Sequence, residues 1–259
     1  MSLEIASAVR MFEVLLGLSL FLQTLEYFKL SHTDQVGHWE IQRQEIPNRP
    51  VRLILDSLFQ ARVYQSLLWI RGGLSLVLMA GQAGLGVSIG LFLLAVLLLM
   101  RWRGAFNGGS DFMTLVGLTG LLIGHALSGW SDSTTAWTMA FWYVTLQSLG
   151  SYFVSGWVKL MRPEWRSGRA LTVFLDQAVH GPLSDNSPFR SPKVALICSW
   201  SFMLWEGLFP LALWNLQVAA VFCSTAAVFH FLVFWFFGLN RFFWAWLSTF
   251  PAILYCASL

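Results

Sequence analysis

Charged residues are scarce in this chain. Asp, Glu, Lys and Arg make up only 11% of its 259 residues, whereas a soluble domain carries about 25%. A water-soluble protein of this length could not cover its surface with so few charges. The net charge of +3 is also too small for a surface that binds phosphates, so we expect no nucleic-acid partner.

Cysteine and the usual metal signatures are also rare or missing. The three cysteines, Cys198, Cys223 and Cys256, are too widely spaced to form a CxxC motif, and we interpret them as small packing residues. The chain has neither a Walker phosphate loop nor an HExxH zinc motif. We therefore predict no metal site.

Apolar residues are abundant: 56% of the chain is hydrophobic, with 14 Trp and 22 Phe. About eight stretches are long and apolar enough to cross roughly 30 Å of hydrocarbon. The sequence thus predicts an all-α, polytopic membrane helix bundle with about eight transmembrane helices, forming one domain over residues 1–259. The predicted spans are 8–28, 64–82, 84–100, 112–130, 136–160, 194–214, 217–238 and 242–258.

The basic residues predict an orientation for this bundle. With eight spans, 13 of the 16 Lys and Arg residues fall in connections on one side, which the positive-inside rule makes cytoplasmic. Both termini would then lie on the non-cytoplasmic side of a cell membrane. The three exceptions are Arg10, Arg71 and Lys159.

Two predicted cytoplasmic connections, 29–63 and 161–193, are long. Residues 51–68, at the end of the first, alternate apolar and polar side chains in the pattern of an amphipathic helix lying on the membrane surface. The first connection also holds His32 and His38. Long connections in a compact bundle usually cover a site or hold a partner.

Ionisable residues inside the spans are costly and mark function or buried pairs. From the helix rise we place Glu206 about 18 Å, His230 about 12 Å and Arg71 about 10 Å from the cytoplasmic face. With Lys159, these side chains could meet in one cavity. The alternatives are that Lys159 reaches the headgroups, that Arg71 and Glu206 form a structural ion pair, and that His230 is a bonded core residue.

The fifth predicted span places four polar residues on one helix face. Ser148, Tyr152, Ser155 and Lys159 follow a 4-3-4 spacing. This pattern fits either a small-residue packing stripe or a polar wall leading to an amine. An amine in an apolar pocket can act as a general base; the sequence does not decide between the two.

Several segments resemble a known family. The stretch 152–171, YFVSGWVKLMRPEWRSGRAL, is similar to the signature of the horizontally transferred transmembrane domain. This is the membrane part of the vitamin K-dependent gamma-glutamyl carboxylase and its bacterial relatives. Residues 106–113, 205–210 and 229–251 fit the same pattern, so the resemblance covers about 101–252.

The resemblance implies a lipophilic quinone or quinol cofactor, with Lys159 as the general base that deprotonates it. Glu206 and His230 match positions typical of the family. With Arg71, placed by its depth, and Tyr152 and Ser155, placed by the helix face, they would line the pocket. The chain has a single lysine before Leu160 where the carboxylase has a pair, and we expect no counterpart of the carboxylase's large soluble domain. Peptide carboxylation is therefore in question, although quinol-type chemistry could remain.

Two functional hypotheses stay open. The first is a membrane enzyme that uses a quinol or similar cofactor. The second is a non-enzymatic accessory protein for the maturation, export or immunity of a peptide or another membrane protein. The first predicts sensitivity at Lys159, and the second predicts sensitivity along residues 51–68 and 161–193. A transporter fits less well because the chain has no clear internal repeat.

Overall fold

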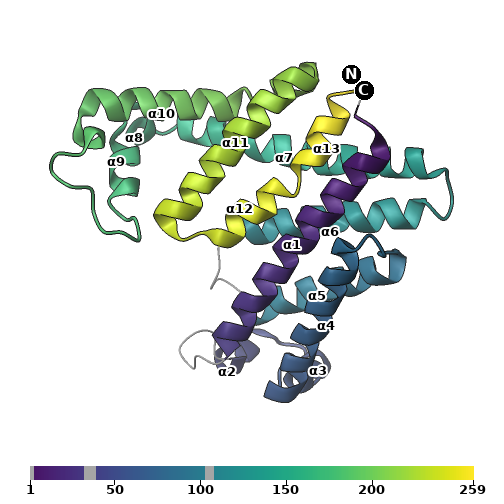
Figure 1. Cartoon of the computed structure of the whole chain (residues 1–259). Coiled ribbons are helices and arrows are strands. Elements are labelled where there is room, and N and C mark those ends of the chain that lie inside the picture. The colour runs from purple at the N-terminus through teal and green to yellow at the C-terminus, as the bar shows by residue number, and fades with distance from the viewer. Residues whose placement is uncertain (1–2, 32–38, 103–107) are drawn as a thin grey trace.

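The computed structural model describes residues 3–31, 39–102 and 108–259, and it is a helical bundle (Figure 1). Helix accounts for 82% of it, and its described part contains no strand. His32 and His38 lie outside the described residues. The all-α prediction is thus confirmed.

Helices occupy all the predicted spans. Hydrophobic runs set these positions because each run can bury or shield an apolar helix surface. The principal helices are α1 (Ile5–Ser31), α4 (Ala61–Met79), α5 (Leu85–Arg101), α6 (Gly108–Leu127), α7 (Ser133–Leu160), α10 (Pro192–Gly207), α11 (Leu216–Phe237), α12 (Asn240–Leu247) and α13 (Phe250–Cys256). The shorter ones are α2 (Trp39–Gln42), α3 (Arg49–Leu58), α8 (Pro163–Arg166) and α9 (Arg169–Leu175), with 3-10 turns η1 (Arg43–Glu45), η2 (Pro188–Arg190) and η3 (Phe209–Trp214).

Three of the described helices are long and apolar enough to cross a membrane, namely α1, α6 and α11. Helix α5 is apolar but shorter, and Ser, Thr, Gln and Tyr residues interrupt the apolar sequence of α7. The count of about eight spans is therefore not confirmed by helix length and composition. What the structure establishes is a helical bundle with three helices of membrane-spanning character.

Two predicted spans are interrupted at prolines. The segment 194–214 is helical to Gly207 and then continues as η3, while 242–258 is divided into α12 and α13. Pro210 and Pro251 have no N–H to continue the helical ladder. At the second break, the hydroxyls of Ser248 and Thr249 donate to carbonyls three residues back.

The predicted surface helix over 51–68 is also divided. Helix α3 ends at Leu58, and a new helix, α4, begins at Ala61 after the extended residue Gln60. Phe59 holds the turn because its buried ring packs edge-on against Trp39, with ring centroids 4.6 Å apart. The amphipathic prediction therefore holds for α3 alone, which exposes Leu53 and Ile54 and buries Leu55.

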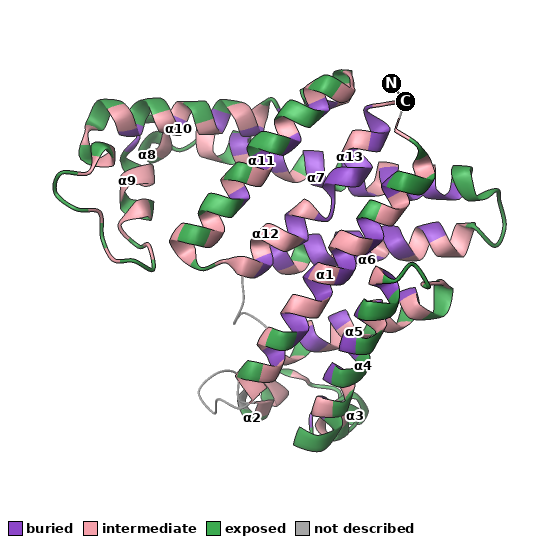
Figure 2. Ribbon diagram, in the orientation of Figure 1, coloured by how far each residue is buried: buried purple, intermediate pink, exposed green. Residues whose placement is uncertain are grey.

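Helix α1 runs through the middle of the bundle and packs against α4, α12 and α13 (Figure 1). Buried residues concentrate around α1, α6, α7 and α13, whereas the outer faces of α10 and α11 are largely exposed (Figure 2). Exposed apolar side chains are numerous on those outer faces, for example Ile197, Val221 and Trp235. Such a surface suits a lipid environment better than water.

Candidate ligand-binding site

The polar residues of α7 share a face, as their spacing predicts. Tyr152, Ser155 and Lys159 all line one cavity. Ser148 lies deeper on the same helix, where its hydroxyl donates to the Val144 carbonyl at 2.8 Å and does not reach the cavity. The stripe is thus partly helix packing and partly a polar wall.

A glycine brings α7 and α10 into close contact at the site. A Cβ atom on Gly156 would lie 2.5 Å from the backbone nitrogen of Gly207 and 2.9 Å from the Met203 carbonyl oxygen. Only glycine allows two helix backbones to approach this closely. The neighbouring residues Ser155 and Glu206 are therefore held within hydrogen-bonding distance across the two helices.

Lys159, Ser155 and Glu206 form a closed triangle of hydrogen bonds. The Lys159 Nζ atom donates to Glu206 Oε2 and to Ser155 Oγ, each at 2.6 Å, and Ser155 Oγ donates to Glu206 Oε1 at 3.2 Å. The two charged side chains are only 17% and 5% exposed. Lys159 therefore points toward Glu206, which favours the cavity interpretation over the alternative that Lys159 reaches the headgroups.

Aromatic rings surround the amine on its other side. Lys159 Nζ lies 4.7 Å from the ring centroid of Phe202 and 5.5 Å from that of Trp165. Cation–π contacts of this kind stabilise the ammonium form in an apolar setting. The pair thus has one polar side, formed by Ser155 and Glu206, and one aromatic side.

A second polar pair joins Tyr152, two turns before Lys159 on α7, to His230 of α11. The Tyr152 hydroxyl is 2.5 Å from His230 Nε2, and both residues are buried. The Tyr152 ring stacks on Phe209 with centroids 3.8 Å apart, and the His230 ring stacks on Trp246 at 5.0 Å. As the sequence predicts, His230 belongs to the same cavity wall as Lys159 and Glu206.

The cavity has a volume of about 570 Å³, within the usual range of roughly 300–1,000 Å³ for small-molecule sites. Apart from the two polar pairs, most of its wall is aromatic or aliphatic. Helices α7, α10, α11 and α12 build that wall. Such a site suits a lipophilic molecule with a few polar groups.

The segment 161–193 covers this cavity, as one reading of its length predicts. It contributes Trp165, Leu171, Phe174, Leu175 and Phe189 to the lining. An ion pair between Arg190 and Asp176 at 2.7 Å closes the segment on itself. A hydrogen bond of 2.8 Å from the Val179 nitrogen to the Phe236 carbonyl fastens it to α11.

Arg71 does not belong to this site, and the prediction that placed it there is wrong. Its guanidinium donates to α1, at the Leu20 carbonyl, the Gln23 amide oxygen and the Thr24 hydroxyl, over 2.6–3.0 Å. The depth of a residue along its helix can be estimated from sequence, but the helix that it faces cannot. Because α4 packs on α1, Arg71 is directed away from the cavity.

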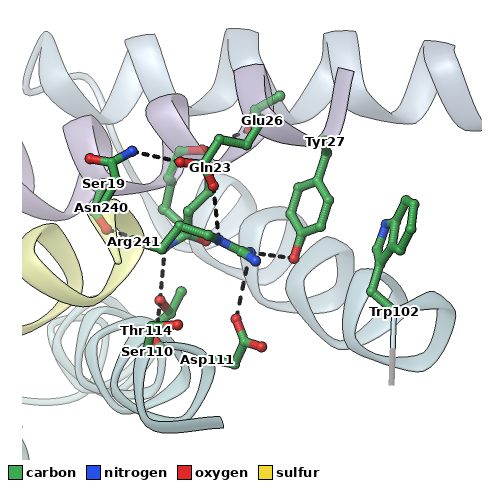
Figure 3. A network of polar contacts seen from close by, with 12 residues as sticks. Ser19, Gln23, Glu26, Tyr27, Trp102, Ser110, Asp111, Thr114, Asn240 and Arg241 are labelled. Atoms are coloured by element: carbon green, nitrogen blue, oxygen red, sulfur yellow. Dashed lines mark hydrogen bonds and ion pairs between the residues drawn. The ribbon is translucent and has the colours of Figure 1, made fainter. Parts of the chain in front are cut away.

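The structure contains a second polar group that the sequence did not predict. We call it the arginine cluster: Arg241, Tyr27, Glu26, Asp111 and Asn240. Arg241 reaches between α1, α6 and α12 (Figure 3). It donates to the Tyr27 hydroxyl and lies 3.4 Å from Glu26 and 3.5 Å from Asp111. Asn240 donates to Glu26 at 2.6 Å. Each residue lies near a helix end, so none stood out in the sequence as buried.

A GxSxG pattern within α5 does not form a catalytic site. Gly86–Gly90 has the GxSxG spacing of a hydrolase nucleophile, which requires a sharp strand-to-helix turn. Here Ser88 lies inside α5, fully buried, and its hydroxyl donates to the Gly84 carbonyl at 3.1 Å. This serine is therefore a helix-packing residue.

Comparisons with known proteins add no further support. A scan against protein-family models gave no match, and neither the curated proteins nor the solved structures searched showed a significant similarity to this chain. The resemblance of 101–252 to the horizontally transferred transmembrane domain thus stays a prediction, and the cavity has to be interpreted from its own residues.

Proposed function

We propose that this chain is a multi-pass integral membrane protein that binds a lipophilic aromatic alcohol, such as a quinol, beside Lys159 and removes its hydroxyl proton. One observation carries the proposal: a buried amine, paired with a carboxylate, forms the polar end of a large apolar cavity. Structural ion pairs are normally packed closely on all sides, whereas this one borders about 570 Å³ of open volume.

Several features support a multi-pass arrangement. Helices coincide with all the apolar stretches, and the exposed faces of α10 and α11 are rich in apolar side chains. The two ends of the chain lie together (Figure 1), with the Leu3 nitrogen 3.2 Å from the Ser258 hydroxyl. Adjacent termini favour an even number of crossings, and the distribution of Lys and Arg favours both ends on the non-cytoplasmic side.

The residues present fit a quinol. Phe202, Phe229 and Trp246 offer flat apolar surfaces for a ring, and Lys159 and His230 offer polar atoms for its oxygens. The aliphatic residues of α9 and α11 would hold an alkyl tail. When bound, such a molecule would supply an acidic hydroxyl and redox chemistry that the side chains lack.

The hydrogen bonds of Lys159 suit a general base. A neutral amine has two N–H groups and one lone pair. If Ser155 and Glu206 accept both N–H groups, the lone pair is left for the aromatic side, where the cavity lies. After the proton is accepted, the ammonium is stabilised by the Glu206 carboxylate and by the neighbouring rings.

The test uses an alkylated naphthol, a redox-stable alcohol whose ionised form absorbs at longer wavelength. Purified protein in lipid nanodiscs should shift part of the bound naphthol to the naphtholate at neutral pH. Lys159→Arg keeps a cation beside Glu206 but cannot act as a base, so it should bind the naphthol without the shift. Lys193→Arg, on the exposed start of α10, is the matched control. An unchanged shift in Lys159→Arg would contradict the proposal.

The accessory hypothesis is a second candidate, and α3 is the observation that favours it. This helix exposes Leu53 and Ile54 beside Arg49 and Arg52, as a helix that binds a membrane surface or a partner would. The segment 161–193, in contrast, is folded over the cavity. If the accessory role is correct, variants at Leu53 and Ile54 should abolish function while Lys159→Arg retains it.

A further inference from the structure

Two hydrogen-bond donors in the cavity wall have no acceptor. His230 Nδ1 and Trp246 Nε1 are both buried, and neither has a hydrogen-bond partner among the described residues. The two residues are 1% and 7% exposed and both line the cavity. Buried polar groups without a partner are rare in folded proteins and usually indicate a missing water, ion or ligand.

The bond to Tyr152 sets the tautomer of His230. Tyr152 is buried, and its hydroxyl has His230 Nε2 as its one hydrogen-bond partner in the described structure. If the hydroxyl donates to Nε2, its own proton is satisfied and the imidazole proton resides on Nδ1. The opposite tautomer would leave the Tyr152 proton unpaired in an apolar wall. Nδ1–H is therefore a donor, as the Trp246 indole always is.

These donors lie apart from the amine. Tyr152, which holds His230, precedes Lys159 by seven residues, which corresponds to about 10 Å along the axis of α7. The oxygen that Lys159 contacts is therefore not the one that the two donors would bind. The rings of His230 and Trp246 are nearly parallel, with an interplanar angle of 21°, and aromatic residues such as Phe229 and Phe242 form much of the surrounding wall.

We infer that His230 and Trp246 form a second anchor, which binds an acceptor oxygen of the ligand at the opposite end of the cavity from Lys159. The ligand class is a lipophilic molecule with two separated oxygens, of which the second is a carbonyl, ether or hydroxyl oxygen. The inference rests on the proposed function in that it assigns the remaining part of the same cavity. It makes Trp246 and His230 specificity-determining residues.

The experiment compares three ligands with the same alkyl chain. These are an alkylated naphthoquinone, the matching naphthalene without oxygens, and a fatty-acid methyl ester that represents lipid carbonyls. Binding to the whole chain in nanodiscs is measured by scintillation proximity, with empty nanodiscs as the partition background. Wild-type protein should bind the naphthoquinone more tightly than the naphthalene. Equal affinities of wild-type protein for the naphthoquinone and the naphthalene would overturn the inference. A failure of the naphthoquinone to bind would overturn it as well.

The variant Trp246→Phe removes the N–H and keeps an aromatic ring. It should weaken naphthoquinone binding about fivefold to tenfold, the usual effect of one hydrogen bond, and leave naphthalene binding unchanged. Trp205→Phe is the matched control, because Trp205 Nε1 also lacks a partner among the described residues but does not line the cavity. An equal loss for both ligands would indicate ring packing, and no loss would indicate that water satisfies the donor; either result overturns the inference.

The ligand series also separates this inference from the proposed function. If Trp246→Phe weakens binding of the methyl ester and not of the naphthoquinone, the anchor exists but serves a lipid carbonyl, and the quinol proposal fails. If naphthoquinone binding depends on Trp246 while naphthol ionisation does not depend on Lys159, the second anchor is supported and the general base is excluded. If naphthol ionisation depends on Lys159 while naphthoquinone binding does not depend on Trp246, the general base is supported and the second anchor is excluded.

Discussion

The arginine cluster and the lysine site contain similar groups but differ in their surroundings. Each places a cation, carboxylate oxygens and aromatic rings inside an apolar bundle. Arg241 lines a hollow of about 370 Å³ whose wall includes the polar residues Glu26, Lys29, Ser110 and Asn240. The cavity beside Lys159 is about 570 Å³, and most of its wall is aromatic or aliphatic. Buried charge alone therefore does not identify a site for a lipophilic ligand; charge beside a large and mainly apolar cavity wall does.

The two cations also differ in chemistry. Arginine keeps its proton at any relevant pH and binds several acceptors through a planar fork, whereas lysine is a point charge that can give up a proton. Arg241 joins three helices through such a fork (Figure 3). We therefore assign a structural role to the arginine cluster and a chemical role to the lysine site. The hollow that Arg241 lines shares Leu239 and Phe242 with the large cavity.

Replacing Arg241 should have the largest effect on stability. Arg241→Met leaves the Asp111 and Glu26 carboxylates uncompensated among α1, α6 and α12, which should cost about 3–5 kcal/mol of unfolding free energy. Thermal or denaturant unfolding of the purified protein measures it. Arg169→Met, on the exposed face of α9, should change stability by less than about 0.5 kcal/mol. Equal losses of unfolding free energy in Arg241→Met and Arg169→Met would contradict the structural role of the arginine cluster.

Removing the lysine alone should cost less than removing Arg241, and removing the whole pair should cost less still. Lys159→Met leaves Glu206 unpaired, at about 2–3 kcal/mol, because the cavity can admit water to the carboxylate. The double variant Lys159→Met/Glu206→Leu should recover to within about 1 kcal/mol of wild type. The same unfolding experiment measures both. A double variant as unstable as the single one would make this ion pair structural, like the arginine cluster.

The close contact at Gly156 gives a third test. Gly156→Ala must push α7 away from the α10 backbone, which should cost about 1–2 kcal/mol and weaken naphthol binding by separating Ser155 from Glu206. Gly150 lies on the same helix, and a Cβ there would meet open space. Gly150→Ala should therefore be neutral or slightly stabilising. Naphthol binding that survives Gly156→Ala unchanged would show that this contact does not position the site.

The smallest effect concerns the surface helices α2 and α3. Hydrogen bonds from Arg43 and then Trp39 hold the pKa of the Asp56 carboxyl below its ordinary value of 3.8. A lowered pKa contributes stability above the unfolded value, and that stability is lost as the pH falls through the folded value. Protection factors of the amides in α2 and α3, which correct for the intrinsic pH dependence of exchange, should therefore fall below about pH 4. In Asp56→Asn this fall should disappear; protection factors that still fall below about pH 4 in the variant would exclude Asp56 as the source.

Much of this architecture can be predicted from sequence, because hydrophobic runs determine where helices form. The 4-3-4 spacing correctly placed Tyr152, Ser155 and Lys159 on one wall, and depth along the helices correctly brought Glu206 and His230 to it. Arg71 was misplaced because depth carries no information on rotation or on the neighbouring helix. The arginine cluster was missed because Tyr27 and Arg241 are 214 residues apart in the chain, and the packing of α12 on α1 brings them together.

Our central claim is that a lipophilic ligand binds in the cavity beside Lys159. Photolabelling with a diazirine-bearing alkyl naphthoquinone, mapped by mass spectrometry, tests this most directly. We expect labels on residues of the cavity wall, such as Phe202, Phe229 and Trp165, that disappear when excess unlabelled naphthoquinone competes. Competable labels confined to α1 and α6, around the arginine cluster, would contradict this interpretation.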